Sequence, residues 1–89
     1  MIFEWDEEKR SANLNKHGLD FVQVAALFDG RPVYTYPSPR GPEQRFVSVG
    51  ALEGRLIAVV WAERERATRI ISMRRGRDGE ERAYRALLG

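Results

Sequence analysis

A continuous apolar run near the middle of the chain, from Leu56 to Ala62, limits the folds that this sequence can form. The run is too short to cross a bilayer. A strand with one wet face would alternate apolar and polar residues, whereas this run does not alternate. It therefore predicts a central strand over Arg55 to Glu63 that is covered on both faces.

Three other segments are expected to join this strand in a sheet. Pro32 to Pro37 is rich in β-forming residues and bounded by prolines, which suits an edge strand. Gln44 to Leu52 and Thr68 to Arg74 have the composition of longer strands, and short turns connect them to the central one. The pattern predicts an antiparallel four-stranded sheet, with Ile2 to Trp5 as a short additional strand at the N-terminus.

Along the chain, two helices are predicted before this run of strands and one after it. Asp6 is a suitable N-cap for a first helix that ends near His17, with Gly18 as its left-handed stop. Asp20 can cap a second helix, whose apolar residues recur at helical spacing up to Phe28. A short helix over Glu80 to Leu88 closes the chain. Helices gathered outside a run of strands indicate an α+β fold.

The length of 89 residues predicts a single domain over residues 1–89. With no cysteine and one histidine, neither a disulfide framework nor a usual zinc site is available, so no metal or other cofactor is expected. The N-terminus carries acidic residues where a signal peptide needs basic and then apolar ones. We expect a soluble, cytoplasmic protein without membrane contact.

Charge is distributed unevenly along the chain, although the net charge is only +2. Residues 1–30 hold three Lys/Arg and six Asp/Glu, whereas residues 31–89 hold twelve and seven. Six arginines and one acidic residue lie between Arg64 and Arg77. Arginine grips phosphate with two parallel hydrogen bonds and stacks on bases, so this segment favours a nucleic-acid partner. A solvated basic face explains the charge alone equally well.

Two segments of the chain resemble the BrnT family of bacterial toxins. The first is Phe3-Glu4-Trp5-Asp6-Glu7-Glu8-Lys9, continued by Asn13-Leu14-Asn15-Lys16-His17-Gly18. The second runs from Ala62-Glu63-Arg64 through Arg69-Ile70-Ile71-Ser72-Met73-Arg74 to Glu81 and Tyr84. Ala62 departs from the pattern, because many relatives have threonine there, so this chain lacks any hydroxyl role at that position.

The resemblance implies a RelE-like fold and a ribonuclease that stops translation. It also implies a DNA-binding antitoxin as partner, similar to the ribbon-helix-helix protein BrnA, which could join two toxins into a heterotetramer. Neither the substrate nor this partner is worked out from composition.

Cleavage of RNA requires few special residues, because the 2′-hydroxyl of RNA is itself the nucleophile. The protein must move two protons and stabilise negative charge on the phosphate, and His, Glu, Tyr, Lys and Arg can do so. The candidate catalytic residues are Lys9, His17, Glu63, Arg64, Arg69, Ser72, Arg74 and Tyr84, and the candidate RNA-binding residues are Arg45, Arg75 and Arg77.

Each candidate also has a structural interpretation. His17 is a candidate for proton transfer, but a histidine in the last turn of a helix also complements the helix dipole. Arg69 and Arg74 should project to opposite faces of their strand unless a bulge intervenes. A non-catalytic RNA- or ribosome-binding module, or a structural subunit that docks an acidic partner, would use the same arginines.

Overall fold

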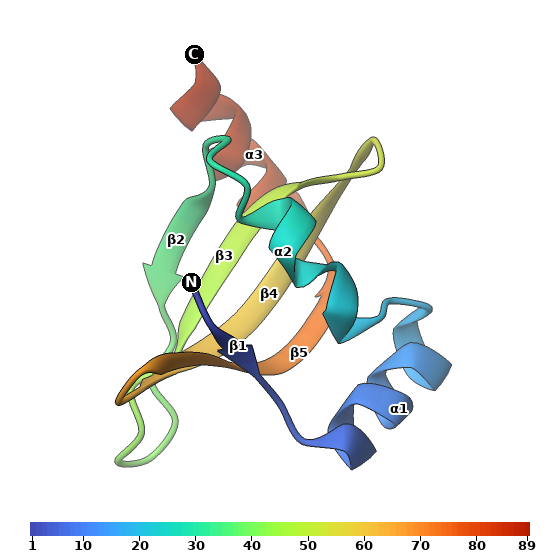
Figure 1. Ribbon diagram of the computed structural model, residues 1–89. Coiled ribbons are helices and arrows are strands. Elements are labelled where there is room, and N and C mark those ends of the chain that lie inside the picture. Colours follow the sequence, from blue (N-terminus) through green and yellow to red (C-terminus); the bar gives the residue numbers. More distant parts are fainter.

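Five strands form one sheet in the order β1-β5-β4-β3-β2 in the computed structural model, which describes residues 1–89 (Figure 1). All neighbouring strands are antiparallel except β1 and β5, which are parallel. The elements, in chain order, are β1 (Phe3–Glu4), α1 (Glu7–His17), the 3₁₀ turn η1 (Phe21–Gln23), α2 (Val24–Leu27), β2 (Tyr34–Pro37), β3 (Phe46–Leu52), β4 (Arg55–Arg64), β5 (Ala67–Arg75) and α3 (Asp78–Leu88).

The predicted central strand lies at the middle of the sheet as β4, and both of its faces are buried. Val59 packs against Phe21 in the larger apolar cluster, which η1 and α2 cover. Ala58 points the other way, into a smaller cluster with Val47 and Tyr84 of α3. Both Ala58 and Val59 are fully buried, so the prediction drawn from the apolar run is confirmed.

Helix α1 lies beside the outer edge of β5 and does not cover a face of the sheet (Figure 1). Its ends follow the predicted caps, because the Asp6 carboxylate accepts from the first-turn N–H groups and Gly18 adopts φ 69°. The buried Asn13 fixes the helix to the strand. Its Oδ1 accepts from the N–H of Met73 at 3.1 Å, and its Nδ2 donates to the carbonyl of Leu19 at 3.1 Å.

The α+β class is confirmed, whereas the details of the elements differ from the prediction. The sheet is not purely antiparallel and four-stranded, because the additional N-terminal strand, β1, joins it by parallel pairing with β5 through Phe3 and Glu4. The second helix is divided into η1 and the four-residue α2. The last helix begins two residues earlier than expected and includes Gly79. The Glu80 carboxylate accepts the backbone N–H of Arg77 and so caps the N-terminus of this helix. No helix is both long and apolar enough to cross a membrane.

A bulge in β5 decides which side chains share a face of the sheet. Ile70 pairs with Trp61 and Ser72 with Val60, so Ile71 is an extra residue without a partner. Strict alternation would place Arg69 and Arg74 on opposite faces. Across the bulge they pair with Ala62 and Ala58, which lie four residues apart on β4, so both arginines belong to one face. Opposite faces were expected from the sequence unless a bulge intervened, and the bulge is present.

Candidate active site

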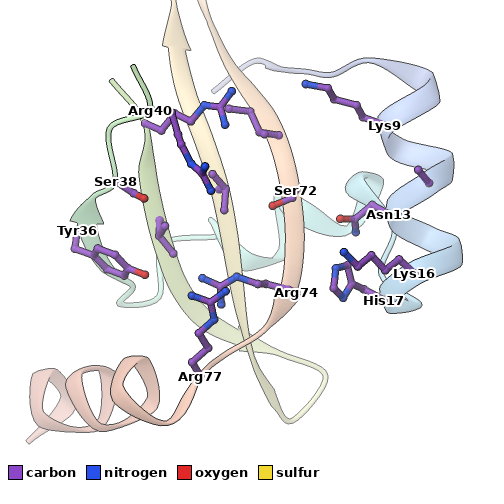
Figure 2. Close-up of a pocket in the computed structure, with 15 residues that line it drawn as sticks. Lys9, Asn13, Lys16, His17, Tyr36, Ser38, Arg40, Ser72, Arg74 and Arg77 are labelled. Carbon is purple, nitrogen blue, oxygen red and sulfur yellow. The ribbon is translucent and has the colours of Figure 1, made fainter. Parts of the chain in front are cut away.

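A cleft of about 640 Å³ lies between α1 and the sheet face that carries Ser72 and Arg74 (Figure 2). Val47 and Val60 form part of its floor, and α1 forms one wall. The loop between β2 and β3 and the start of α3 complete the lining. The lining residues are Lys9, Ala12, Asn13, Lys16, His17, Tyr36, Ser38, Arg40, Arg45, Val47, Val60, Ile71, Ser72, Arg74 and Arg77.

The lining is strongly basic and contains no Asp or Glu. Six of its residues are Lys or Arg, and His17 is a seventh group that can carry positive charge. Four cations form no ion pair within the chain, namely Lys9, Lys16, Arg40 and Arg77, whereas Arg45 and Arg74 are paired. A concave surface lined by one sign of charge attracts a polyanion over a long range.

Arg74 is the most firmly held cation of the cleft. Its Nη1 and Nη2 donate to the two carboxylate oxygens of Glu80 at 2.7 and 2.9 Å. The same carboxylate accepts from the Tyr36 hydroxyl and from the Arg77 backbone N–H. Only 8% of the Glu80 side chain and 16% of the Arg74 side chain are exposed, so water competes little for these bonds.

The charges of this network are stable near neutral pH. Burial raises the pKa of Glu80, but hydrogen bonds from Arg74, Tyr36 and the Arg77 backbone outweigh it and hold that pKa at about 2. The hydrogen bonds to Glu80 raise the pKa of Arg74. Burial and the bond to Glu80 raise the pKa of the Tyr36 phenol. Arg74 therefore presents a fixed positive charge, with the remaining N–H groups of its guanidinium available to a ligand.

Six of the residues predicted from the sequence line the cleft together, although they come from four separate parts of the chain. Lys9 and His17 extend from α1, and Ser72 and Arg74 from β5 (Figure 2). The other two, Arg45 and Arg77, lie before β3 and at the start of α3.

The other predicted residues lie outside the cleft lining. Arg64 is at the end of β4, where it pairs with Glu43 at 2.7 Å, and Glu63 is exposed beside it. Arg69 is bound by Glu4 of β1 at 2.8 Å. Tyr84 is 8% exposed and packs in the apolar cluster under α3. Its role in the structure is therefore that of a core residue. Arg75 is exposed where β5 pairs with Ile57, and it does not line the cleft, although its neighbour Arg74 does.

Several cleft residues were missed, among them Asn13 and Lys16, although their spacing from the predicted Lys9 and His17 was a signal. Lys9, Asn13, Lys16 and His17 are spaced at i, i+4, i+7 and i+8, which places them on one face of a helix. In the sequence analysis, Lys9 and His17 were weighed one at a time, and the polar stripe that they form with Asn13 and Lys16 was not considered. The residues Tyr36, Ser38 and Arg40, in β2 and the following loop, carried no comparable pattern.

Comparison with known protein families identifies a match over most of the chain. A family model described as "Ribonuclease toxin, BrnT, of type II toxin-antitoxin system" matches residues 5–80. This segment includes every residue that lines the cleft. No curated protein matches the chain.

Proposed function

The chain belongs to the BrnT family of ribonuclease toxins of type II toxin–antitoxin systems, and from this premise we propose that it cleaves RNA inside the basic cleft. The reaction is attack by the 2′-hydroxyl of RNA without a metal ion, and the cut strands no longer support translation.

The observation that carries this proposal is the composition of the cleft. Six Lys/Arg side chains converge there with His17 and with no carboxylate. The arrangement suits the phosphates of a nucleic acid. Mg²⁺ is usually held through carboxylate oxygens, which this lining does not offer, so the chemistry is assigned to the side chains themselves.

The residues of the cleft can supply the charge stabilisation and one of the two proton transfers that the reaction needs. The 2′-oxygen attacks the adjacent phosphorus while the bond from phosphorus to the 5′-oxygen breaks, which leaves a 2′,3′-cyclic phosphate and a 5′-hydroxyl. One group must take the proton of the 2′-hydroxyl and another must give a proton to the 5′-oxygen. We assign a proton transfer to His17, because no carboxylate is within the lining to perform it. Arg74, with Lys9 and Lys16 opposite, stabilises the charge that develops on the phosphate.

The family also implies a protein antitoxin. We propose a BrnA-like ribbon-helix-helix partner that inhibits the enzyme by covering the cleft and that can join two toxins into a heterotetramer. An acidic segment of such a partner would neutralise the same cations that hold RNA.

The proposal is tested by incubating the purified protein with an RNA oligonucleotide in EDTA, beside an all-deoxy strand of the same sequence. We expect cuts in the RNA, products that end in a cyclic phosphate, and an intact DNA strand. His17→Ala should remove one limb of the pH–rate profile, whereas Asn15→Ala on the exposed part of the same helix should leave the profile unchanged. Cleavage of the DNA strand, or an absolute need for a divalent ion, would contradict the mechanism.

A protein that binds the RNA oligonucleotide in the cleft but never cuts it would instead be a non-catalytic RNA-binding module. The bidentate pair of Arg74 with Glu80 is compatible with that function as well, because it positions a phosphate contact with or without chemistry.

A further inference from the structure

A second, shallower hollow of about 430 Å³ opens beside the basic cleft, between β2 and the first turn of α3. It is lined by Tyr34, Tyr36, Arg77, Gly79 and Glu80. Tyr36 and Arg77 also line the cleft and lie on the side of it nearest α3 (Figure 2). A strand of nucleic acid in the cleft can therefore extend into the hollow without leaving the surface.

One wall of the hollow is aromatic and rigid. Tyr34 and Tyr36 are two residues apart on β2, so they lie on the same face, with ring centroids 5.7 Å apart. Both rings are half-buried against the apolar cluster under α3, and the Tyr36 hydroxyl donates to Glu80. Rings that are already fixed lose little freedom when a flat ligand stacks on them.

The other side of the hollow is open and positively charged. The Arg77 guanidinium forms no ion pair and lies between the hollow and the cleft. At Gly79 an added Cβ would meet nothing closer than Nη2 of Arg82, at 3.9 Å, so space remains above the first turn of α3. The Glu80 carboxylate already accepts from Arg74, Tyr36 and Arg77, which leaves it little capacity to repel or bind a ligand.

We propose that this hollow is a nucleobase subsite, in which an unpaired base next to the cut phosphate stacks on Tyr34 while Arg77 contacts the connecting phosphate. The inference rests on the proposed function and adds to it that the substrate is single-stranded at this position. An RNA base fits better than an apolar protein side chain, because the hollow continues into a cleft of cations and carries no exposed aliphatic residue. Base stacking on aromatic side chains is also common in recognition of single strands.

The test removes single bases from the RNA and fills the hollow in the protein. After the cut site has been mapped, RNA oligonucleotides are made with a single 2′-deoxy residue at that site, so that they bind without being cut. Each also lacks the base at one nearby position. Affinities are measured for the wild type, for Gly79→Leu, which fills the hollow, and for Gly79→Ala as the matched control. Leucine and alanine are both better helix formers than glycine, so neither substitution should impair folding.

At one position next to the cut, loss of the base should weaken binding to the wild type and to Gly79→Ala by about ten-fold. The same loss should have no effect on Gly79→Leu, which already binds the complete RNA about as weakly. Tyr34→Leu should behave like Gly79→Leu, and Tyr34→Phe like the wild type, because phenylalanine keeps the stacking ring.

If loss of the base weakens RNA binding equally in the wild type and in Gly79→Leu, the subsite is refuted, whereas the proposed nuclease activity is unaffected. The same conclusion follows if Gly79→Leu weakens only the binding of an antitoxin. If the wild type cuts no RNA at all, it is the proposed function that fails.

Discussion

At the scale of single residues, Arg74 differs from the other cations of the cleft because a buried carboxylate positions it. Both oxygens of Glu80 hold its guanidinium, whereas Lys9, Lys16 and Arg40 have no acidic partner. A charge that is already oriented needs no reorganisation when the transition state forms, which is how such groups lower a barrier. The lysines add positive charge on the opposite side of the cleft, but their flexible side chains hold it in a less fixed position.

This difference predicts how replacements of Arg74 act. Arg74→Ala should lower the single-turnover rate at saturating enzyme by about 10²-fold or more, as expected for a lost charge-stabilising donor. Arg74→Lys should recover little of it, because an ammonium cannot make the two parallel bonds to Glu80. Arg55→Ala, at the exposed first residue of β4, serves as the control and should keep the full rate. An unchanged saturated rate with weaker binding would assign Arg74 to binding alone.

Glu80 should govern part of the acid stability of the fold. Its pKa is about 2 in the folded chain against 4.5 ordinarily, so its contribution is complete above pH 4.5 and is lost as the pH falls towards 2. At about 1.4 kcal/mol per pH unit, this corresponds to roughly 3 kcal/mol. Glu80→Gln should lose about this much unfolding free energy at neutral pH, and its difference from the wild type should shrink between pH 4.5 and 2.

Urea denaturation at a series of pH values measures this effect. Glu81→Gln, the same substitution one residue later in α3, removes only an exposed pair with Arg85 and should change the stability by less than about 1 kcal/mol. If the two variants lose stability equally, or if the pH dependence of Glu80→Gln follows the wild type, the network does not hold the charge of Glu80.

At the scale of elements, the site depends on two features that local sequence patterns do not encode. One is the bulge at Ile71, which brings Arg69 and Arg74 to one face although strand alternation predicts opposite faces. The other is the docking of α1 beside β5, which aims the polar stripe of the helix across the strand (Figure 2).

The capping residues, the central strand and the α+β class were predictable because caps and apolar runs act within a few residues. Pairing of β1 with β5 joins segments more than sixty residues apart and leaves no local trace.

Docking of α1 predicts a large effect for Asn13. Asn13→Ala should cost about 1–3 kcal/mol, because the N–H of Met73 loses its acceptor in a buried place. The Met73 amide should exchange with solvent faster, and cleavage should weaken because Lys16 and His17 lose their position with the helix. Denaturation and hydrogen exchange measure both effects. Asn15→Ala, an exposed asparagine of the same helix, should do neither, and equal effects from both variants would argue against this hydrogen bond as the tether.

At the scale of the whole molecule, the cleft draws its charge from both ends of an unevenly charged chain. The first thirty residues carry an excess of acids, yet they supply both lysines of the chain and His17 to the lining. The arginine-rich segment from Arg64 to Arg77 supplies only Arg74 and Arg77, because its other arginines lie elsewhere on the surface or pair with Glu43 and Glu4. Counting charge along the sequence therefore identified only part of the cations that line the cleft.

Salt dependence of RNA binding should distinguish Arg77 from Arg75, which lie two residues apart in the arginine-rich segment. Binding of single-stranded RNA should weaken as salt rises, with a slope of log K against log salt near −0.7 for each phosphate contact. Arg77 lines the cleft and Arg75 does not, so Arg77→Ala should flatten the slope by about 0.7 while Arg75→Ala leaves it unchanged. Affinity of an uncuttable RNA oligonucleotide between low and moderate salt measures both slopes. If the antitoxin covers the cleft, only Arg77→Ala should also weaken its competition with this RNA. Equal slopes for the two variants would mean that RNA follows the exposed face of the arginine-rich segment and not the cleft.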